Sequence, residues 1–202
     1  MTRIVNELYV TECITFPRCG HTWLSRILKY YFKNDLNYCE MYNNPELMID
    51  VNENTNLQKN HDIHLYTPVK NDRKYLIQIR GAENCLNSYY KLEVENIDNN
   101  YFKKEMGSTD LINFQEYRRY NDWIEEKKIF YNHFLNKWVF KYIPNSKIVI
   151  YEHLKDNTIE EVLSIIKFMT DKDGDREKLL IAIENSNEPH LVNEQFKEKY
   201  IV

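Results

Sequence analysis

The stretch from Cys13 to Leu24 brings together the residue types that bind a phosphate group. Its sequence is Cys-Ile-Thr-Phe-Pro-Arg-Cys-Gly-His-Thr-Trp-Leu, which predicts a buried strand that ends at Pro17, a turn through Gly20 and the start of a helix. The first turn of a helix leaves backbone N–H groups without intrahelical partners and carries the positive end of the helix dipole. Gly20 has no Cβ, so its backbone can approach a ligand closely. The stretch therefore predicts an anion site, with phosphate as the expected ligand.

The common phosphate loop of nucleotide-binding proteins, G-x-x-x-x-G-K-[ST], fits this stretch only in part. If Gly20 and Thr22 take the last glycine and the hydroxyl position, the lysine position holds His21 and the basic residue moves to Arg18. A magnesium-dependent kinase also needs an acidic residue after a neighbouring apolar strand, and only Glu152 is placed to serve. We keep an ATP-dependent P-loop kinase as one alternative, and a module that binds a nucleotide without catalysis as another.

The composition bounds the class of protein. The chain has 202 residues, of which 43% are hydrophobic and 29% charged, with a net charge of −4, as is typical of one ordinary globular domain. General nucleic-acid binders usually carry a basic excess, so we expect no nucleic-acid partner. Neither the apolar core of a signal peptide nor a run of about 18 apolar residues occurs, so we expect a cytoplasmic protein with no membrane partner. The composition leaves the oligomeric state open.

The cysteines are expected to remain reduced. Cys13, Cys19, Cys39 and Cys85 show neither CxxC pairing nor a metal-like spacing with histidines. A cytosolic location also disfavours a disulfide framework. We therefore expect no disulfide and no metal site.

Alternating strand and helix patterns predict the fold class. Apolar runs predict strands at residues 12–16, 74–80 and 147–151, with a short one at 63–67. Helical spacing predicts helices at 22–32, 82–94, 158–169 (opened by a capping box at Thr158) and 175–185, and a helical region at 111–142 with a break near 127. Loops are expected at 34–60, with one short helix near 45–49, and at 96–109. This order predicts a single α/β domain, a three-layer sandwich around a mostly parallel sheet whose ligands bind at the carboxyl ends of the strands.

Two stretches carry a resemblance to a known family. Residues 15–24, Thr-Phe-Pro-Arg-Cys-Gly-His-Thr-Trp-Leu, are similar to the Y-P-[KR]-[SA]-G-[TN]-[TS]-W-L segment of sulfotransferases that use 3′-phosphoadenosine 5′-phosphosulfate (PAPS). Residues 75–90, Tyr-Leu-Ile-Gln-Ile-Arg-Gly-Ala-Glu-Asn-Cys-Leu-Asn-Ser-Tyr-Tyr, look like that family's second signature, a strand ending in R-x-P-x-D-x-x-x-S-x-Y. Arg80 and Ser88 keep its spacing of arginine and serine.

Two later stretches agree with this resemblance. Residues 131–138 resemble a family helix that carries a histidine and a tryptophan, and residues 147–156, Lys-Ile-Val-Ile-Tyr-Glu-His-Leu-Lys-Asp, resemble its strand ending Y-E-D-L. The four matches follow the family's order between Ile14 and Met169. The resemblance implies a P-loop-like sulfotransferase fold and a metal-independent transfer of a sulfuryl group from PAPS to a hydroxyl or amine of a small-molecule or saccharide acceptor.

The resemblance also assigns roles to individual residues. Arg18 would bind the phosphosulfate and neutralise the charge that develops on it during transfer, together with the backbone of the residues that follow it. Arg80 and Ser88 would bind the 3′-phosphate, where an arginine makes a charge-assisted hydrogen bond. Tyr151 would face the nucleotide. The expected nucleotide-binding set is Arg18, Cys19, Gly20, His21, Thr22, Trp23 (beside the adenine), Arg80, Ser88 and Tyr151.

The family's base is often the histidine of a K-x-H-x-P motif. The nearest stretch here is Asp62-Ile-His64-Leu-Tyr-Thr-Pro68, so we expect His64 to be the base, because an imidazole titrates near neutral pH. His61, Asp62 and Lys59 are its competitors.

The chain departs from the family pattern in three places. Asp62 stands where the motif has lysine, and Pro68 comes two residues late. Residues 81–84, Gly-Ala-Glu-Asn, replace the proline and aspartate after the arginine. The glycine-rich R-K-G motif that adds contacts to the 3′-phosphate does not occur.

Overall fold

The computed structural model describes residues 2–41, 54–95 and 120–187. Its main sheet has five strands in the order β4-β5-β3-β6-β7, and every neighbouring pair runs parallel. A small antiparallel hairpin, β1-β2, precedes it. The strands are β1 Ile4–Val5, β2 Leu8–Tyr9, β3 Thr11–Thr15, β4 Tyr38–Met41, β5 Leu57–Asn60, β6 Lys74–Ile79 and β7 Ser146–Ile150.

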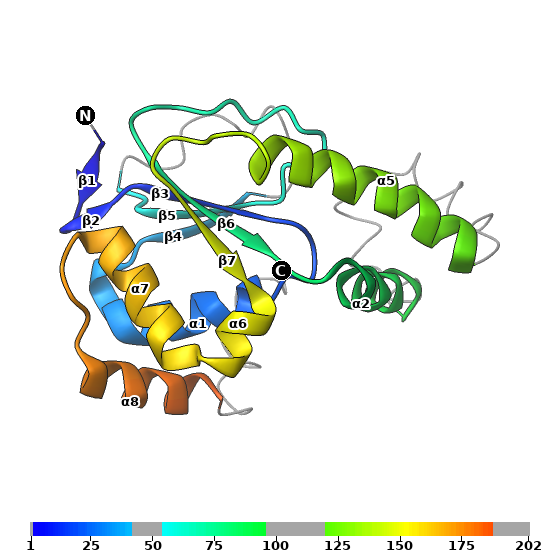
Figure 1. Cartoon of the computed structure of the whole chain (residues 1–202). Helices are drawn as coiled ribbons and strands as arrows, with labels where there is room; N and C mark the ends of the chain where they lie inside the picture. The colour runs from blue at the N-terminus through cyan, green and yellow to red at the C-terminus, as the bar shows by residue number, and fades with distance from the viewer. Residues whose placement is uncertain (1, 42–53, 96–119, 188–202) are drawn as a thin grey trace, which may run out of the picture.

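Helices cover both faces of this sheet (Figure 1). They are α1 His21–Phe32, η1 Lys33–Asp35, α2 Ala82–Glu95, α5 Tyr120–Trp138, α6 Tyr151–Asp156, α7 Thr158–Thr170 and α8 Arg176–Ser186. Successive strand residues point to opposite faces. Cys13 of β3 and Leu76 of β6 therefore pack with α1, α7 and α8, whereas Ile14 and Ile77 pack with α2 and α5. This confirms the predicted three-layer α/β sandwich with a parallel sheet, an architecture consistent with a P-loop-like sulfotransferase fold.

The predicted loop at residues 34–60 was wrong at its two ends, which form β4 and β5. The sequence of β5, Leu-Gln-Lys-Asn, is polar, yet all four residues are buried between β4 and β3. Specific partners make this burial possible: Asn60 Nδ2 donates to Glu12 Oε1 at 2.9 Å, and Lys59 Nζ pairs with Glu40 Oε2 at 3.4 Å. The strand predicted at 63–67 does not form, because the sheet uses the segment just before it.

The helices also differ from expectation in detail. The long helix α5 is continuous through Lys127, and it ends at Trp138 rather than at residue 142. The strand β7 ends at Ile150, so that Tyr151 opens the short helix α6. The capping box at Thr158 was wrong, because the Thr158 hydroxyl donates backwards to the Lys155 carbonyl at 3.3 Å and no side chain caps α7. The predictions at 45–49, 96–109 and 111–119 lie outside the described residues.

Candidate functional site

The loop between β3 and α1 is the first part of the site. Arg18 (φ 69°) and Gly20 (φ 84°) both have left-handed backbones, and Gly20 occupies the N-cap position of α1. No side chain caps this helix, and no acidic residue lies in its first turn. The first amides of α1 therefore keep their positive potential for an external anion.

The start of this loop is fixed by aromatic packing. The Phe16 side chain is fully buried, and its ring meets those of Tyr131 and Phe134 edge-on at centroid distances of 4.7 Å and 5.6 Å. Edge-to-face pairs of this kind contribute about 0.5–1.5 kcal/mol each beyond their buried area. The loop is thus held at its base by α5, while Arg18 is exposed.

Tyr151 packs directly against Gly20. A Cβ added to Gly20 would lie 2.3 Å from Tyr151 Cδ2. The Tyr151 ring also lies under the Arg80 guanidinium, whose Cζ is 4.6 Å from the ring centroid. The absence of a side chain at residue 20 therefore lets the tyrosine occupy the space between the loop and β6.

Replacing Gly20 with alanine is expected to lower the free energy of unfolding by about 2–4 kcal/mol, because it combines a left-handed alanine with a steric clash against Tyr151. Urea denaturation measures this loss. Gly81→Ala is the matched control, since its added Cβ would lie 3.2 Å from Glu152 Oε1, the end of a side chain rather than a ring; we expect a loss below about 1 kcal/mol there. Equal losses in both variants would contradict the close approach at Gly20.

The predicted phosphate ligands meet at one place. Arg18 Nε donates to Ser88 Oγ on α2 at 3.0 Å, and Arg80 Nη1 donates to the Arg18 carbonyl at 3.2 Å. Three side chains drawn from the loop, the end of β6 and α2 are thereby connected around the N-terminus of α1. The structure brings Arg18, Gly20, Arg80, Ser88 and Tyr151 together as one cluster.

Arg80 is held through its backbone as well as through its side chain. The Tyr131 hydroxyl donates to the Arg80 carbonyl at 2.5 Å, and the amide of the next residue, Gly81, donates to Glu152 Oε1 at 3.0 Å. The Arg80 Nε atom is buried and has no hydrogen-bond acceptor among the described residues. A buried guanidinium N–H without an acceptor is costly, and an anionic oxygen would satisfy it.

The other predicted loop residues contribute differently. Thr22 is exposed, and Trp23 is half-buried against the core formed with α7 and α8. Cys19 is buried beside Cys85 of α2, with the two sulfur atoms 3.6 Å apart. These residues can offer a ligand their backbone and, for Thr22 and Trp23, an exposed part of the side chain.

The His21 ring faces the protein interior. Its Nε2 lies 2.9 Å from the Tyr38 hydroxyl, which itself donates to Glu40 Oε1 at 2.7 Å, so Nε2 is the donor of this pair. Its Nδ1 then accepts from Cys13 Sγ at 3.0 Å. Burial, with a smaller contribution from the nearby Lys59 ammonium, lowers the pKa of His21 to about 3. The ring is neutral and cannot replace the phosphate-loop lysine.

His64, the expected base, lies in the segment after β5. Its side chain is exposed and stacks on Tyr66 at a centroid distance of 5.8 Å. Among the described residues, no hydrogen bond or ion pair joins His64 to residues 16–20, the loop between β3 and α1 that we call the phosphate loop.

His61 lies much closer to the loop. Its Nδ1 is 2.6 Å from the carbonyl of Thr15, the last residue of β3. A carbonyl only accepts, so Nδ1 carries the proton and the lone pair is on Nε2. Burial first, and the Lys59 ammonium second, lower the pKa of His61 to about 4. A neutral imidazole therefore stands at the carboxyl end of β5, beside the strand that leads into the phosphate loop.

Asp62, another competitor, is engaged in packing. Its Oδ2 accepts from Lys137 Nζ at 2.6 Å and from Trp138 Nε1 at 2.8 Å, and its Oδ1 accepts from the Thr67 amide at 2.8 Å. These bonds anchor the segment after β5 to α5.

A sequence signal for His61 does exist, since Lys59-Asn60-His61 has the K-x-H spacing of the family motif.

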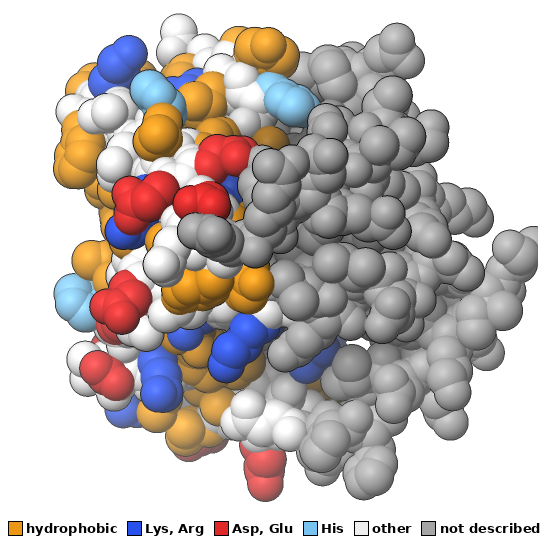
Figure 2. Space-filling model, turned by 90° about the vertical axis from the view of Figure 1, so that its right-hand side faces the viewer, with side chains coloured by type: hydrophobic (Ala, Val, Ile, Leu, Met, Phe, Trp, Pro, Cys, Tyr) orange, Lys and Arg blue, Asp and Glu red, His pale blue; other side chains and the backbone are white. Residues whose placement is uncertain are grey.

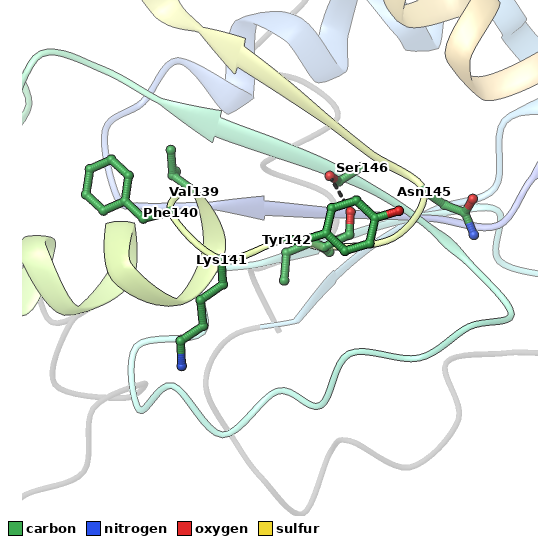
Figure 3. A pocket seen from close by; sticks show the side chains of 7 residues that line it. Val139, Phe140, Lys141, Tyr142, Asn145 and Ser146 are labelled. Carbon is green, nitrogen blue, oxygen red and sulfur yellow. Dashed lines mark hydrogen bonds between the residues drawn. The ribbon is translucent and has the colours of Figure 1, made fainter.

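A surface hollow of about 490 Å³ lies elsewhere, lined by Val139–Ile143, Asn145 and Ser146 (Figure 3). Ser146 begins β7, whereas the phosphate loop follows the end of the parallel strand β3. The hollow therefore lies at the end of the sheet where the strands begin, opposite the end where the loop after β3 lies. We assign the candidate site to the cluster of Arg18, Gly20, Arg80, Ser88 and Tyr151, called the loop cluster below. Ligands of parallel sheets bind at the carboxyl ends of the strands, where this cluster lies.

The face of the molecule drawn in Figure 2 carries charged side chains of both signs in its described part. On that face, basic and acidic side chains are interspersed with hydrophobic ones in the described part. Within residues 2–41, 54–95 and 120–187, no three metal-ligating side chains gather in a group that could hold an ion. Over the same ranges no helix has the length and apolar character to cross a bilayer, and none of the four cysteines is in a disulfide.

Comparison with known proteins finds distant likenesses to solved structures, and one of them is described here. No family model and no curated protein matches the chain. The chain is similar to the crystal structure of a sulfotransferase from Alicyclobacillus acidocaldarius, with 13% sequence identity and a TM-score of 0.44, over 88% of this chain and 92% of that one. A likeness this distant leaves the assignment of function to the residues of the loop cluster.

Proposed function

We propose that this protein is a PAPS-dependent sulfotransferase that transfers a sulfuryl group to a hydroxyl or amine of a small-molecule or saccharide acceptor. The observation that carries the proposal is the cluster of Arg18, Ser88 and Arg80 at the uncapped start of α1, with the buried Arg80 Nε lacking an acceptor. The first two of the four ordered sequence motifs contain these same residues. Their convergence in space supports the resemblance beyond any one motif.

The residues present fit a nucleotide with phosphate groups at both ends of its ribose. The first amides of α1 and Arg18 would hold the 5′-phosphosulfate, which is the group that supplies the sulfuryl for transfer. Arg80 and Ser88 would hold the 3′-phosphate, and the Tyr151 ring would close the site beside Gly20. These groups bind, orient and neutralise charge, which is most of what an in-line transfer of this type requires.

On the acceptor side we assign the base to His61 rather than His64. Its Nδ1–H is fixed by the Thr15 carbonyl, which orients the basic Nε2. In the transfer, the acceptor oxygen or nitrogen forms a bond to sulfur, the bond from sulfur to the phosphate oxygen breaks, and the acceptor proton moves to His61 Nε2. The products are the sulfated acceptor, 3′-phosphoadenosine 5′-phosphate (PAP) and the proton held by His61.

The low pKa of His61 is compatible with this role. A pKa of about 4 keeps the imidazole neutral at pH 7, as a proton acceptor must be. Such a group is a weak base in the empty site. The negative charge of a bound phosphosulfate would raise this pKa, because an anion nearby favours the protonated ring.

Isothermal titration calorimetry with PAP tests the proposal. We expect one PAP to bind per chain with a dissociation constant in the micromolar range or below, without added metal, and transfer from labelled PAPS to some member of an acceptor panel. Adenosine 5′-monophosphate, which differs from PAP only in lacking the 3′-phosphate, is the matched ligand and should bind at least about tenfold more weakly, the loss of one charge-assisted contact. Absence of PAP binding would overturn the proposal, and binding without any transfer would favour the non-catalytic module.

The kinase alternative makes a different prediction in the same experiment. It requires ATP to bind with Mg²⁺ in preference to PAP. The neutral, inward-facing His21 at the lysine position and the use of Glu152 to accept the Gly81 amide both disfavour it.

A further inference from the structure

Two thiols connect the phosphate loop to the helix behind it. Cys19 belongs to the loop, and Cys85 lies in the first turn of α2; their sulfur atoms are 3.6 Å apart. Both are buried, with 1% and 0% of their surfaces exposed. None of the chemistry proposed above uses either sulfur.

We propose that Cys19 and Cys85 form a reversible disulfide that displaces the phosphate loop and lowers the affinity of the site for its nucleotide. The part concerning the nucleotide rests on the proposed function. The formation of the bond and the movement of the loop do not.

The geometry makes the loop the part that moves. A disulfide has an S–S length of about 2.05 Å, so the two sulfur atoms must approach by about 1.5 Å. Cys85 is fixed in a helix of 14 residues. Cys19 stands between Arg18 and Gly20, whose left-handed backbones interrupt regular hydrogen bonding. Closing the bond therefore pulls the loop toward α2.

The bond would also remove a contact that holds the loop in its present position. The Cys85 thiol donates to the Pro17 carbonyl at 3.1 Å, and a disulfide has no S–H to donate. The displaced loop carries Arg18, which holds Ser88 through its side chain and Arg80 through its carbonyl. A shift of the loop thus changes the spacing of the three groups proposed to bind phosphate.

The oxidant that balances the step is hydrogen peroxide. One thiol, as its thiolate, attacks the peroxide and becomes a sulfenic acid with release of water; the second then attacks that sulfur, forming the S–S bond and releasing a second water. Two electrons leave the thiol pair and reduce one peroxide. Burial is the main cause that raises the pKa of Cys19, so oxidation requires opening of the loop and is slow. Bound nucleotide, which holds the loop closed, retards it.

The experiment treats the full-length protein with hydrogen peroxide, blocks remaining thiols with iodoacetamide and analyses the peptides by mass spectrometry. We expect a peptide pair joined through Cys19 and Cys85, a PAP dissociation constant raised at least about tenfold, and recovery of both states by dithiothreitol. Saturating PAP should slow the cross-link. Alkylation of both thiols after peroxide, or a cross-link with unchanged PAP affinity, would overturn the inference.

Matched variants separate this effect from general oxidation. Cys85→Ser keeps a donor for the Pro17 carbonyl, so it should form no cross-link and should bind PAP equally before and after peroxide. Cys19→Ala should also form no cross-link. Cys39→Ser, on β4 and outside the cluster, should behave as wild type. If reduced wild type binds no PAP, the proposed function fails; amide hydrogen exchange of the loop then decides the inference, which requires different exchange rates in the cross-linked and reduced proteins.

Discussion

Replacing His61 with alanine is expected to reduce sulfuryl transfer by about 10²–10⁴-fold, the usual contribution of a general base. The affinity for PAP should stay within about twofold, because the imidazole acts on the acceptor and the phosphate ligands are untouched. Single-turnover transfer from labelled PAPS and calorimetry with PAP measure the two quantities. The separation between them identifies a group that acts in the chemical step.

His64→Ala is the internal control for this result. The two histidines are three residues apart, but His64 is exposed and stacked on Tyr66, whereas His61 is bonded to the Thr15 carbonyl. We expect the His64 variant to keep wild-type transfer. A large loss in His64→Ala with none in His61→Ala would return the base to the position expected from the sequence. In the wild type, kcat/KM should fall as the pH decreases through about 4, since His61 becomes protonated below its pKa.

Replacing Arg80 with alanine is expected to weaken PAP binding by about 10–100-fold, since a hydrogen bond to a charged group contributes about 1.5–3 kcal/mol. The fold should persist, because Tyr131 bonds to the Arg80 carbonyl and α2 begins beyond it. Calorimetry with PAP and with adenosine 5′-monophosphate measures the change. The loss should be confined to PAP, the ligand that has the 3′-phosphate.

Two further variants frame the Arg80 result. Arg80→Lys keeps the charge without the planar fork and should fall between wild type and alanine. Arg176→Ala, which removes an exposed arginine paired with Glu160 on the surface, should leave PAP binding unchanged. An equal loss for both ligands in Arg80→Ala would show that Arg80 supports the loop rather than binding the 3′-phosphate.

The parts of the fold that the sequence predicted are those with a strong local pattern. β6 is rich in apolar residues, β7 contains the apolar run Ile148–Ile150, β3 contains Cys13 and Ile14 and is followed by Phe16, and α1 and α7 have a clear apolar face. The strand β5 escaped prediction because it is polar and buried at once. Its stability depends on Glu12 and Glu40, partners that are remote in the sequence, and no local propensity encodes such a pairing.

The expectation of His64 as the base came from the likeness of residues 62–68 to the K-x-H-x-P motif. With β5 at Leu57–Asn60, the residue that directly follows the carboxyl end of the strand is His61. The proximity of Arg80 and Ser88 could be anticipated from the sequence, because their spacing lies within one strand-to-helix unit. That Arg18 bonds to Ser88 and that Tyr151 fills the space beside Gly20 are tertiary facts, beyond what a linear motif contains.

The contacts that build the cluster also determine when it forms during folding. Arg18 and Ser88 are 70 residues apart, and Asp62, which anchors the segment holding His61, is 75 residues from Lys137. Tyr151 comes from still later in the chain. Bringing residues so distant in the sequence together costs chain entropy before the contact can stabilise the protein. Such contacts therefore form late and slowly. Helix α1, whose hydrogen bonds are local, can thus form early, whereas the cluster around the loop between β3 and α1 is complete only after β7 and α6 have docked.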